Sequence, residues 1–131
     1  MAVRVHFTSE RQNWKTPKAF YQALDAEFAF DFDPCPPNPG FDGLSVEWGK
    51  SNFVNPPYNQ MARWVEKAYQ EHQAGKTVVM LIPSRTDTRW WHDFIMRANE
   101  IRFIKGRLKF DDQKNNAPFP SAVIVFKKDS Q

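Results

Sequence analysis

The stretch "TVVMLIP" at residues 77–83 constrains the fold more than any other feature of the sequence. It is apolar almost throughout and lacks the alternation of apolar and polar residues that marks a strand with one face in water. A short continuous apolar run rich in β-branched residues is typical of a strand buried on both faces. The chain therefore predicts a layered fold in which residues 77–83 form a central parallel strand with helices on both faces of the sheet.

The other segments alternate between strand and helix patterns. We expect helices over residues 16–28, 60–73 and 87–98, and strands over residues 28–33, 44–48, 52–54, 77–83 and 121–126, with two more strands around a turn at Gly106 within residues 100–110. Thr16 suits the N-cap of the first helix and Pro17 its first turn. This order predicts an α/β fold with a mostly parallel sheet and an antiparallel C-terminal strand.

Length and composition predict one globular domain. The chain has 131 residues, of which 41% are hydrophobic and 25% charged. We expect a flexible N-terminal arm over residues 1–15 and a single domain over residues 16–127. The one cysteine excludes an intramolecular disulfide and a multi-cysteine zinc site, and the three histidines lack metal-ligand spacing, so no metal is expected. No signal peptide or membrane-spanning run is evident, which predicts a cytoplasmic protein with no membrane partner.

The stretch "NFVNPPYNQ" at residues 52–60 is the main candidate for a functional site. Its two prolines remove two backbone donors, fix two φ angles, and hold Asn55 and Pro56 extended. The stretch follows a predicted strand, as does "DPCPPNPG" at residues 33–40. Both would then lie at the carboxyl ends of the strands, where α/β sheets bind ligands. A structural turn at the end of a strand is the alternative interpretation.

The chemistry of this stretch suits an amine whose lone pair is delocalised into a ring, such as the exocyclic amino group of adenine. Two acceptors that take both N–H bonds draw the nitrogen towards a tetrahedral shape and free its lone pair. The Asn55 side-chain oxygen and the Pro56 carbonyl are such a pair, and Tyr58 offers a face for stacking, worth ~1–3 kcal/mol per base. Such a site works by positioning and electrostatic preorganisation, and it needs an electrophile held in line, such as a methyl sulfonium.

Together with its neighbours, this stretch resembles the small phage-type, Dam-like DNA N6-adenine methyltransferases, whose Asn/Asp-Pro-Pro-Tyr signature is "NPPY" here. The resemblance covers roughly residues 13–127 and rests on five blocks in order: "NWKTPKAFYQALDAEFAFDFDPCPPN", "FVNPPYNQMARWVEKA", "VVMLIPSRTDTRWWHDF", "IRFIKGRLKF" and "NNAPFPSAVIVF". It implies a minimal Rossmann-like (class I methyltransferase) three-layer fold that transfers a methyl group from S-adenosylmethionine to adenine N6 in double-stranded DNA, with the target base flipped out. It also implies a phage- or prophage-encoded protein in a bacterial host cell.

The resemblance assigns candidate roles to named residues. The catalytic loop would be formed by Asn55, Pro56, Pro57 and Tyr58. The candidates for cofactor binding are Thr16, Pro17, Asp33, Pro34, Cys35 and Asp42, where Asp42 would hold the ribose hydroxyls and Glu47 is the reserve. The sequence departs from the wider methyltransferase pattern because no Gly-x-Gly follows Asp33; only Gly40 and Gly43 lie nearby. Phe53 and Phe119 are candidate further walls for the flipped base.

A net charge of +3 is compatible with a polyanionic partner. The basic residues expected near the mouth of the site, as candidate phosphate contacts, are Arg85, Arg89, Lys105, Arg107, Lys109 and Lys114. At this length we expect no separate target-recognition domain. Sequence preference would then come from loops, from the N-terminal arm or from a second subunit, which keeps a homodimer among the expectations.

Other interpretations stay open at this point. The same loop chemistry suits cytosine N4, adenine in RNA or a glutamine amide in a protein. The missing Gly-x-Gly also allows a related fold that binds nucleic acid without catalysis. Cys35 follows a proline, as does the nucleophilic thiol of C5-cytosine methyltransferases, although those enzymes lack an Asn-Pro-Pro-Tyr loop.

Overall fold

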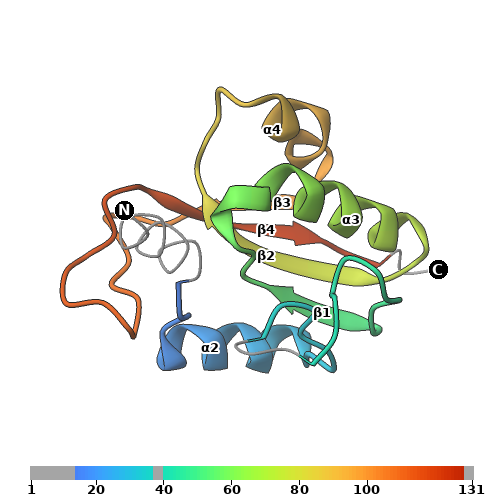
Figure 1. Ribbon diagram of the computed structural model, residues 1–131, viewed down its shortest axis with the longest axis horizontal. Helices are drawn as coiled ribbons and strands as arrows, with labels where there is room; N and C mark the ends of the chain where they lie inside the picture. Colours follow the sequence, from blue (N-terminus) through green and yellow to red (C-terminus); the bar gives the residue numbers. More distant parts are fainter. Residues whose placement is uncertain (1–13, 37–39, 129–131) are drawn as a thin grey trace, which may run out of the picture.

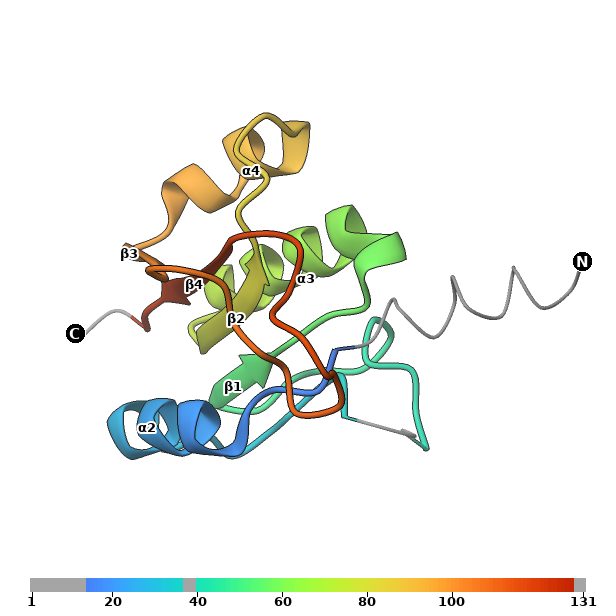
Figure 2. The ribbon, with the colours of Figure 1, turned by 90° about the vertical axis from the view of Figure 1, so that its left-hand side faces the viewer.

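The computed structural model describes residues 14–36 and 40–128. They form a four-stranded sheet in the order β1-β2-β4-β3, built from β1 (Ser51–Val54), β2 (Thr77–Pro83), β3 (Glu100–Phe103) and β4 (Ser121–Phe126). Helix α2 (Lys18–Phe28) lies on one face, and α3 (Met61–Gln73) and α4 (Arg89–Asp93) lie on the other (Figures 1 and 2). The expected α/β fold, with helices on both faces, is therefore present.

Strand β1, helix α3 and strand β2 form a βαβ unit, the part of the fold that positions the site. β1 pairs with β2 in parallel, from Ser51 opposite Thr77 to Val54 opposite Met80. The helix between them buries a stripe of residues at helical spacing: Met61, Trp64, Val65 and Ala68. It stops before Gly75, whose φ of 99° is strained for residues with a side chain. "NPPY" thus lies between the carboxyl end of β1 and the start of α3.

The sheet is mixed, so the prediction of a mostly parallel sheet holds for the directions of the strands but not for their pairing. β4 is antiparallel to both β2 and β3, as expected for the C-terminal strand, and it lies between them. β1, β2 and β3 therefore run in one direction, but only β1 and β2 are parallel neighbours. An apolar run such as residues 77–83 indicates burial on both faces, and burial does not specify the direction of the neighbouring strand.

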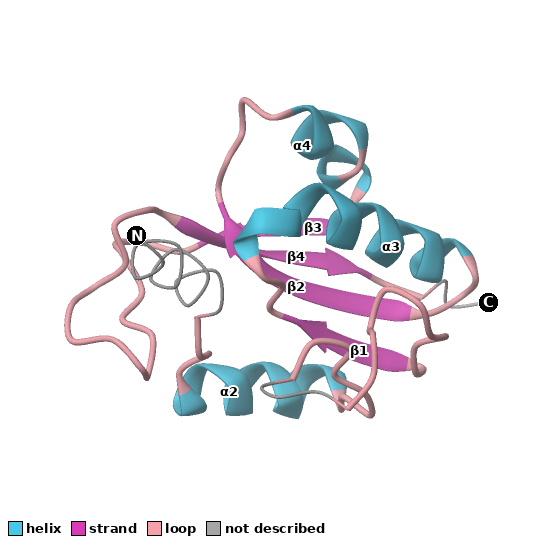
Figure 3. Ribbon diagram, in the orientation of Figure 1, coloured by secondary structure: helices cyan, strands magenta, loops and turns pink. Residues whose placement is uncertain are grey.

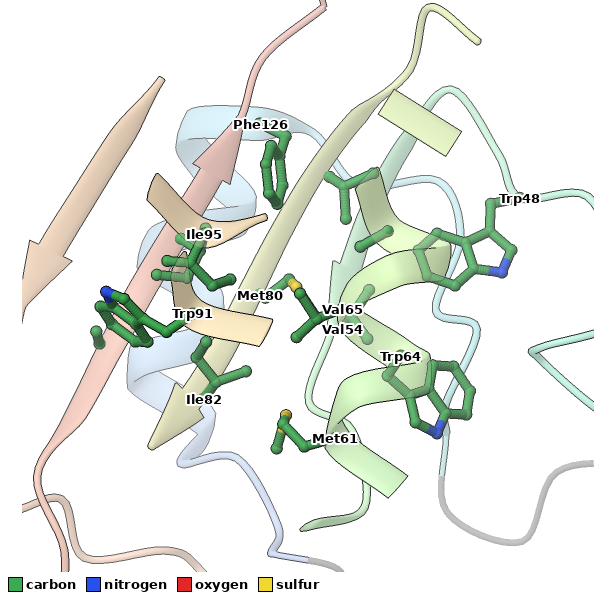
Figure 4. Packing of buried hydrophobic residues seen from close by; sticks show 14 residues of the cluster. Trp48, Val54, Met61, Trp64, Val65, Met80, Ile82, Trp91, Ile95 and Phe126 are labelled. Carbon is green, nitrogen blue, oxygen red and sulfur yellow. The ribbon is translucent and has the colours of Figure 1, made fainter. Parts of the chain in front are cut away.

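The core has two halves, one on each face of the sheet. Alternate residues of β2 point to opposite faces: Met80 and Ile82 pack under α3 and α4, and Val79 and Leu81 pack towards α2. On the α3 side, Met80 meets Val54 and Val65 (Figure 4). The α2 side is rich in aromatic residues, among them Trp14, Phe53, Phe110 and Phe119. This aromatic half adjoins the Asn-Pro-Pro-Tyr stretch, because Tyr58 packs against both halves.

Several predicted elements are shorter than expected or absent. Residues 28–33 make only one bridge, Phe32 with Asn52. The Asp31 carboxylate also accepts from the backbone amides of Lys50 and Ser51. Residues 44–48 are turn and coil, and the chain after Gly106 (φ 75°) forms no strand before β4. Residues 40–50 and 104–120 are thus long loops (Figure 3).

The two helix predictions at residues 16–28 and 87–98 also need correction. Helix α4 ends at Asp93, and a separate 3₁₀ turn follows at Ile95–Arg97. In α2, Pro17 is the N-cap position, and Thr16 lies before it. The Lys18 amide is capped by the Asp111 carboxylate from the 104–120 loop instead. No helix in the described part of the chain is long and apolar enough to cross a membrane.

Candidate active site

A cavity of about 780 Å³ opens beside the carboxyl end of β1. Thr16 contributes from the segment before α2, and Asn55 and Pro57 from the stretch after β1. The 33–43 loop contributes the residues Asp33, Pro34, Cys35, Pro36, Phe41, Asp42 and Gly43. The structure therefore brings together the two stretches that the sequence predicted to share a crevice. Five of the six predicted cofactor residues line the cavity, and Pro17 does not.

The Asn55 side chain has a fixed orientation at the cavity wall. Its Nδ2 group donates hydrogen bonds to the Trp14 carbonyl and to Thr16 Oγ1, the latter at 2.9 Å. Its Oδ1 atom is buried and accepts no hydrogen bond from the described residues. Buried polar atoms are normally paired, so an acceptor without a partner, in a side chain that lines a cavity, is a candidate for a donor that binds there.

Tyr58 lies in an aromatic cluster next to the cavity and is not part of its lining. Its ring stacks on Trp14, with centroids 6.0 Å apart and planes 22° from parallel, and meets Phe119 edge-on at 5.2 Å. Burial raises the pKa of the Tyr58 phenol, an effect that the positive charge of Arg85 opposes. The Tyr58 hydroxyl and Trp14 Nε1 are also buried without a partner among the described residues. Three unpaired polar atoms thus belong to Trp14, Asn55 and Tyr58, which are neighbours near the end of β1.

Asp33 and Cys35 lie on the opposite wall. The Cys35 amide donates to Asp33 Oδ1 at 2.9 Å. Burial raises the pKa of Asp33, and that hydrogen bond opposes the shift. Burial, followed by the charge of Asp33, raises the pKa of the Cys35 thiol to about 12. A thiol with this pKa is almost fully protonated at neutral pH, which argues against Cys35 as a nucleophile.

Asp42 fits an acceptor role at this site better than Glu47 does. Asp42 lines the cavity, and its carboxylate accepts from Ser45 Oγ at 2.7 Å and from the Leu44 amide at 3.0 Å. The bond from Ser45, then that from Leu44, holds the pKa of Asp42 below its usual value. Glu47 instead pairs with Lys76 at 3.2 Å and is absent from the lining.

Gly43 lines the cavity and packs closely against Pro34 and Trp64. A Cβ atom built on Gly43 would lie 1.9 Å from the Pro34 carbonyl oxygen and 2.7 Å from the Trp64 ring. Trp48 Nε1 donates to the Gly43 carbonyl at 2.7 Å. Only glycine lets the backbone at residue 43 approach Pro34 and the Trp64 ring this closely. The sequence showed that a glycine lies here, but not this close approach.

Sequence reasoning missed several residues of the lining. Besides Gly43 and Trp64 they are Trp14, Lys15, Tyr21, Pro36, Phe41, Asn59, Gln60 and Asp112. Trp14 and Lys15 were assigned to the N-terminal arm, yet Trp14 is 8% exposed and the Lys15 amide donates to Asp112. The remainder of that arm, residues 1–13, lies outside the described residues. Proximity in sequence to Thr16 was the one available signal for Trp14.

Two comparisons with known proteins bear on this site. Residues 5–131 match the family described as "DNA N-6-adenine-methyltransferase (Dam)". The chain belongs to this Dam family. A relative from Escherichia phage T1, named DNA N-6-adenine-methyltransferase, is 26% identical over 118 residues, covering 80% of this chain and 50% of the phage protein. One of the same name from Haemophilus phage HP1 is 27% identical, covering 90% of this chain and 80% of the relative. The chain thus spans about half the length of the phage T1 relative.

In this Dam-family chain, the residues predicted to contact phosphates lie on the segments that follow β2 and β3 at one end of the sheet. Arg85 and Arg89 follow β2, and the 104–120 loop, with Lys105, Arg107 and Lys114, joins the carboxyl end of β3 to β4. That end is also where β1 leads into "NPPY". All five side chains are exposed, and none forms an ion pair with a described carboxylate. Lys109, the sixth, donates to the Gln113 carbonyl.

Proposed function

We propose that this protein transfers the methyl group of S-adenosylmethionine to the exocyclic N6 amino group of adenine in double-stranded DNA. The observation that carries the proposal is the open acceptor, Asn55 Oδ1, in a side chain that lines a cavity of about 780 Å³. Membership of the Dam family and the printed names of the two phage relatives support the same reaction.

The cavity suits a nucleoside cofactor with a positive charge. Its volume falls within the roughly 300–1,000 Å³ of small-molecule sites. Aromatic side chains, Phe41, Phe53 and Trp64, offer faces for an adenine ring, and Asp33 and Asp42 supply negative charge. When bound, S-adenosylmethionine supplies an electrophilic methyl group on a sulfonium. We assign Asp42 to the ribose hydroxyls because its carboxylate is exposed within the lining.

The chain's own residues would act on the target amine. Asn55 Oδ1 and the Pro56 carbonyl would accept its two N–H bonds and free the lone pair that forms the new N–C bond, while the S–C bond to the methyl group breaks and its electron pair stays on sulfur as a neutral thioether. The methylated nitrogen then releases one proton to water. The Trp14 ring covers one face of Tyr58 in the described conformation, so the extruded base would stack on the opposite face. Extrusion costs a few kcal/mol, which stacking and phosphate contacts offset.

The βαβ unit, the helices on both faces and a cavity at the carboxyl end of β1 support a minimal Rossmann-like methyltransferase domain over residues 16–127. Because the two relatives come from phages, the protein would act in the cytoplasm of a bacterial host. The homodimer stays a prediction, which light scattering on the purified protein would test.

The first experiment is a methyl-transfer assay with labelled S-adenosylmethionine and unmethylated DNA, followed by analysis of the labelled nucleoside. Asn55→Ala should lower the rate at least about 100-fold, the usual cost of removing one preorganised transition-state contact. Asn99→Ala is the matched control, because it also removes an asparagine side chain. Asn99 is exposed and follows α4, and its Oδ1 atom accepts a hydrogen bond from the Lys127 amide.

Label in N6-methyladenine that is lost in Asn55→Ala and retained in Asn99→Ala supports the proposal. Label in N4-methylcytosine, in RNA or in a protein would keep the site and replace the substrate. The absence of label from all of these, together with no heat of binding for S-adenosylmethionine in calorimetry, would refute the assignment as an enzyme.

The DNA contacts have a separate test. Each phosphate contact adds about 0.9 to the slope of log K against log salt concentration. Arg107→Gln and Lys114→Gln should each reduce that slope by about this amount. Lys50→Gln, which changes an exposed lysine directly before β1 at the opposite end of the sheet, should leave the slope unchanged. Equal slopes in all variants would exclude the 104–120 loop as a phosphate contact.

A further inference from the structure

We propose that Thr16 is a positioning residue that determines which end of the Asn55 carboxamide meets the target amine. This inference rests on the proposed function and deepens it. The resemblance implied only a cofactor contact for Thr16. The structure adds a direct hydrogen bond from Asn55 Nδ2 to Thr16 Oγ1 at 2.9 Å, across 39 positions of sequence.

A carboxamide has two ends of nearly equal shape and opposite hydrogen-bonding character. With Oδ1 towards an amine, the side chain accepts an N–H bond; rotated by half a turn, it presents N–H groups to N–H groups. The proposed chemistry works in the first orientation alone. Asn55 therefore needs partners that distinguish its nitrogen from its oxygen.

The two partners of Asn55 Nδ2 make that distinction together. The Trp14 carbonyl has no hydrogen and can only accept, so it excludes the rotated amide. Thr16 Oγ1 accepts the second hydrogen of the same nitrogen. Both donor hydrogens are thus used on one side, and Oδ1 is left as a buried acceptor with no partner among residues 14–36 and 40–128.

The segment that carries these partners is itself held in place. The Trp14 indole packs against Phe110 and Phe119 with ring centroids 5.5 and 5.3 Å away. The Lys15 amide donates to Asp112, and the Asp111 amide donates to the Lys15 carbonyl at 3.0 Å. The start of α2 and the 104–120 loop lie side by side in Figures 1 and 2. The Thr16 hydroxyl is therefore held in place by a segment of chain that the 104–120 loop anchors.

The test compares Thr16→Val, which removes the hydroxyl at similar volume, with Thr16→Ser, which retains it. Thr16→Val should lower kcat by about 10- to 100-fold, the range expected when a reacting group is slightly misplaced. Its KM for DNA should stay within about threefold, and Thr16→Ser should restore most of kcat. Thr77→Val is the matched control, because that hydroxyl also accepts one hydrogen bond, from the Lys128 amide, at the opposite end of β2.

Asn55→Asp is an independent second variant. A carboxylate would place an oxygen against the Trp14 carbonyl in either orientation, so kcat should fall even though the family signature accepts Asp at this position. A parent protein that methylates DNA while Thr16→Val keeps its kcat, or raises only the KM for S-adenosylmethionine, would overturn the inference. So would failure of Thr16→Ser to recover activity, or full activity of Asn55→Asp. Failure of the proposed function is distinct, since the parent itself would then transfer no methyl group to adenine.

Discussion

Gly43→Ala is the substitution whose effect follows most directly from the geometry. The added Cβ would lie 1.9 Å from the Pro34 carbonyl oxygen, whereas ordinary van der Waals contact begins at 3.4 Å, so the two groups must separate by about 1.5 Å. The second neighbour, the Trp64 ring, belongs to a side chain only 5% exposed and cannot easily move. Overpacking of this kind lowers stability by about 1–3 kcal/mol. We expect the upper end of this range, because backbone lies on one side of the added Cβ and a buried indole on the other.

A loss of about 3 kcal/mol corresponds to a fall in Tm of roughly 12 °C for a domain of this size. The displaced 33–43 loop also carries Asp33, Cys35 and Asp42 towards the cavity. We therefore expect the affinity for S-adenosylmethionine to fall at least about tenfold, since a loss of about 1.4 kcal/mol of binding free energy is sufficient. Calorimetric titration and thermal unfolding of the same samples measure both effects.

Gly40→Ala is the matched control in the same loop. A Cβ at Gly40 has no heavy atom within 4 Å, so this change should leave both Tm and cofactor affinity at the parent's values. If Gly43→Ala matched Gly40→Ala in both measurements, the close packing of the 33–43 loop against Pro34 and Trp64 would be refuted.

Three further predictions concern titratable groups. Glu71 is 8% exposed, and bonds from Lys67, Lys76 and the Trp48 amide hold its pKa below the usual value despite its burial. Glu71→Gln should therefore lower the free energy of urea unfolding by about 3 kcal/mol at pH 7. The loss should shrink as pH falls below about 4.5, where the carboxylate becomes protonated. An equal loss at pH 7 and below pH 4.5 would contradict this pairing. Burial raises the pKa of Asp33, so the folded state disfavours the charged carboxylate and loses stability as pH rises. Asp33→Asn should therefore stabilise the protein more at pH 7 than at pH 4. An equal stabilisation at the two pH values would contradict the raised pKa. With a pKa of about 12, Cys35 should react with iodoacetamide at pH 8 roughly a thousandfold more slowly in the folded protein than in urea, and comparable rates would disprove a buried thiol.

The fold was predictable where one local pattern determined the outcome. The bounds of β2 and β4 match the apolar runs at residues 77–83 and 121–126, because a strand buried on both faces has no other pattern. The second helix was also found, at Met61–Gln73, since its apolar stripe ends at a glycine. The pairing of the strands was not predictable in this way, because the insertion of β4 between β2 and β3 depends on long-range contacts that leave no local signal.

The sequence predicted part of the cavity lining and none of the contacts within it. The sequence placed Asn55, Thr16 and Asp33 near one crevice, and the structure lines one cavity with all three. It assigned Thr16 to capping α2, whereas the hydroxyl contacts Asn55 and an aspartate from a distant loop caps the helix. A capping pattern identifies a hydroxyl near the start of a helix. It does not show that the amide of Asn55, 39 positions away, binds this hydroxyl.

The place of β4 in the sheet sets an order on how the polypeptide acquires its structure. β1, α3 and β2 are contiguous in sequence and can associate as soon as they are made. β3 is made next but, among the described strands, pairs only with β4, which is made after it. Until β4 arrives, the inner edge of β2 and the whole of β3 have unpaired backbone groups next to apolar side chains, a state prone to aggregation. Asp111 and Asp112, which bind the amides of Lys18 and Lys15 on either side of Thr16, come from the loop between these strands. Translation must therefore reach the last strand before the loop that anchors the Thr16 segment is fixed at both ends, and with it the orientation of the Asn55 amide.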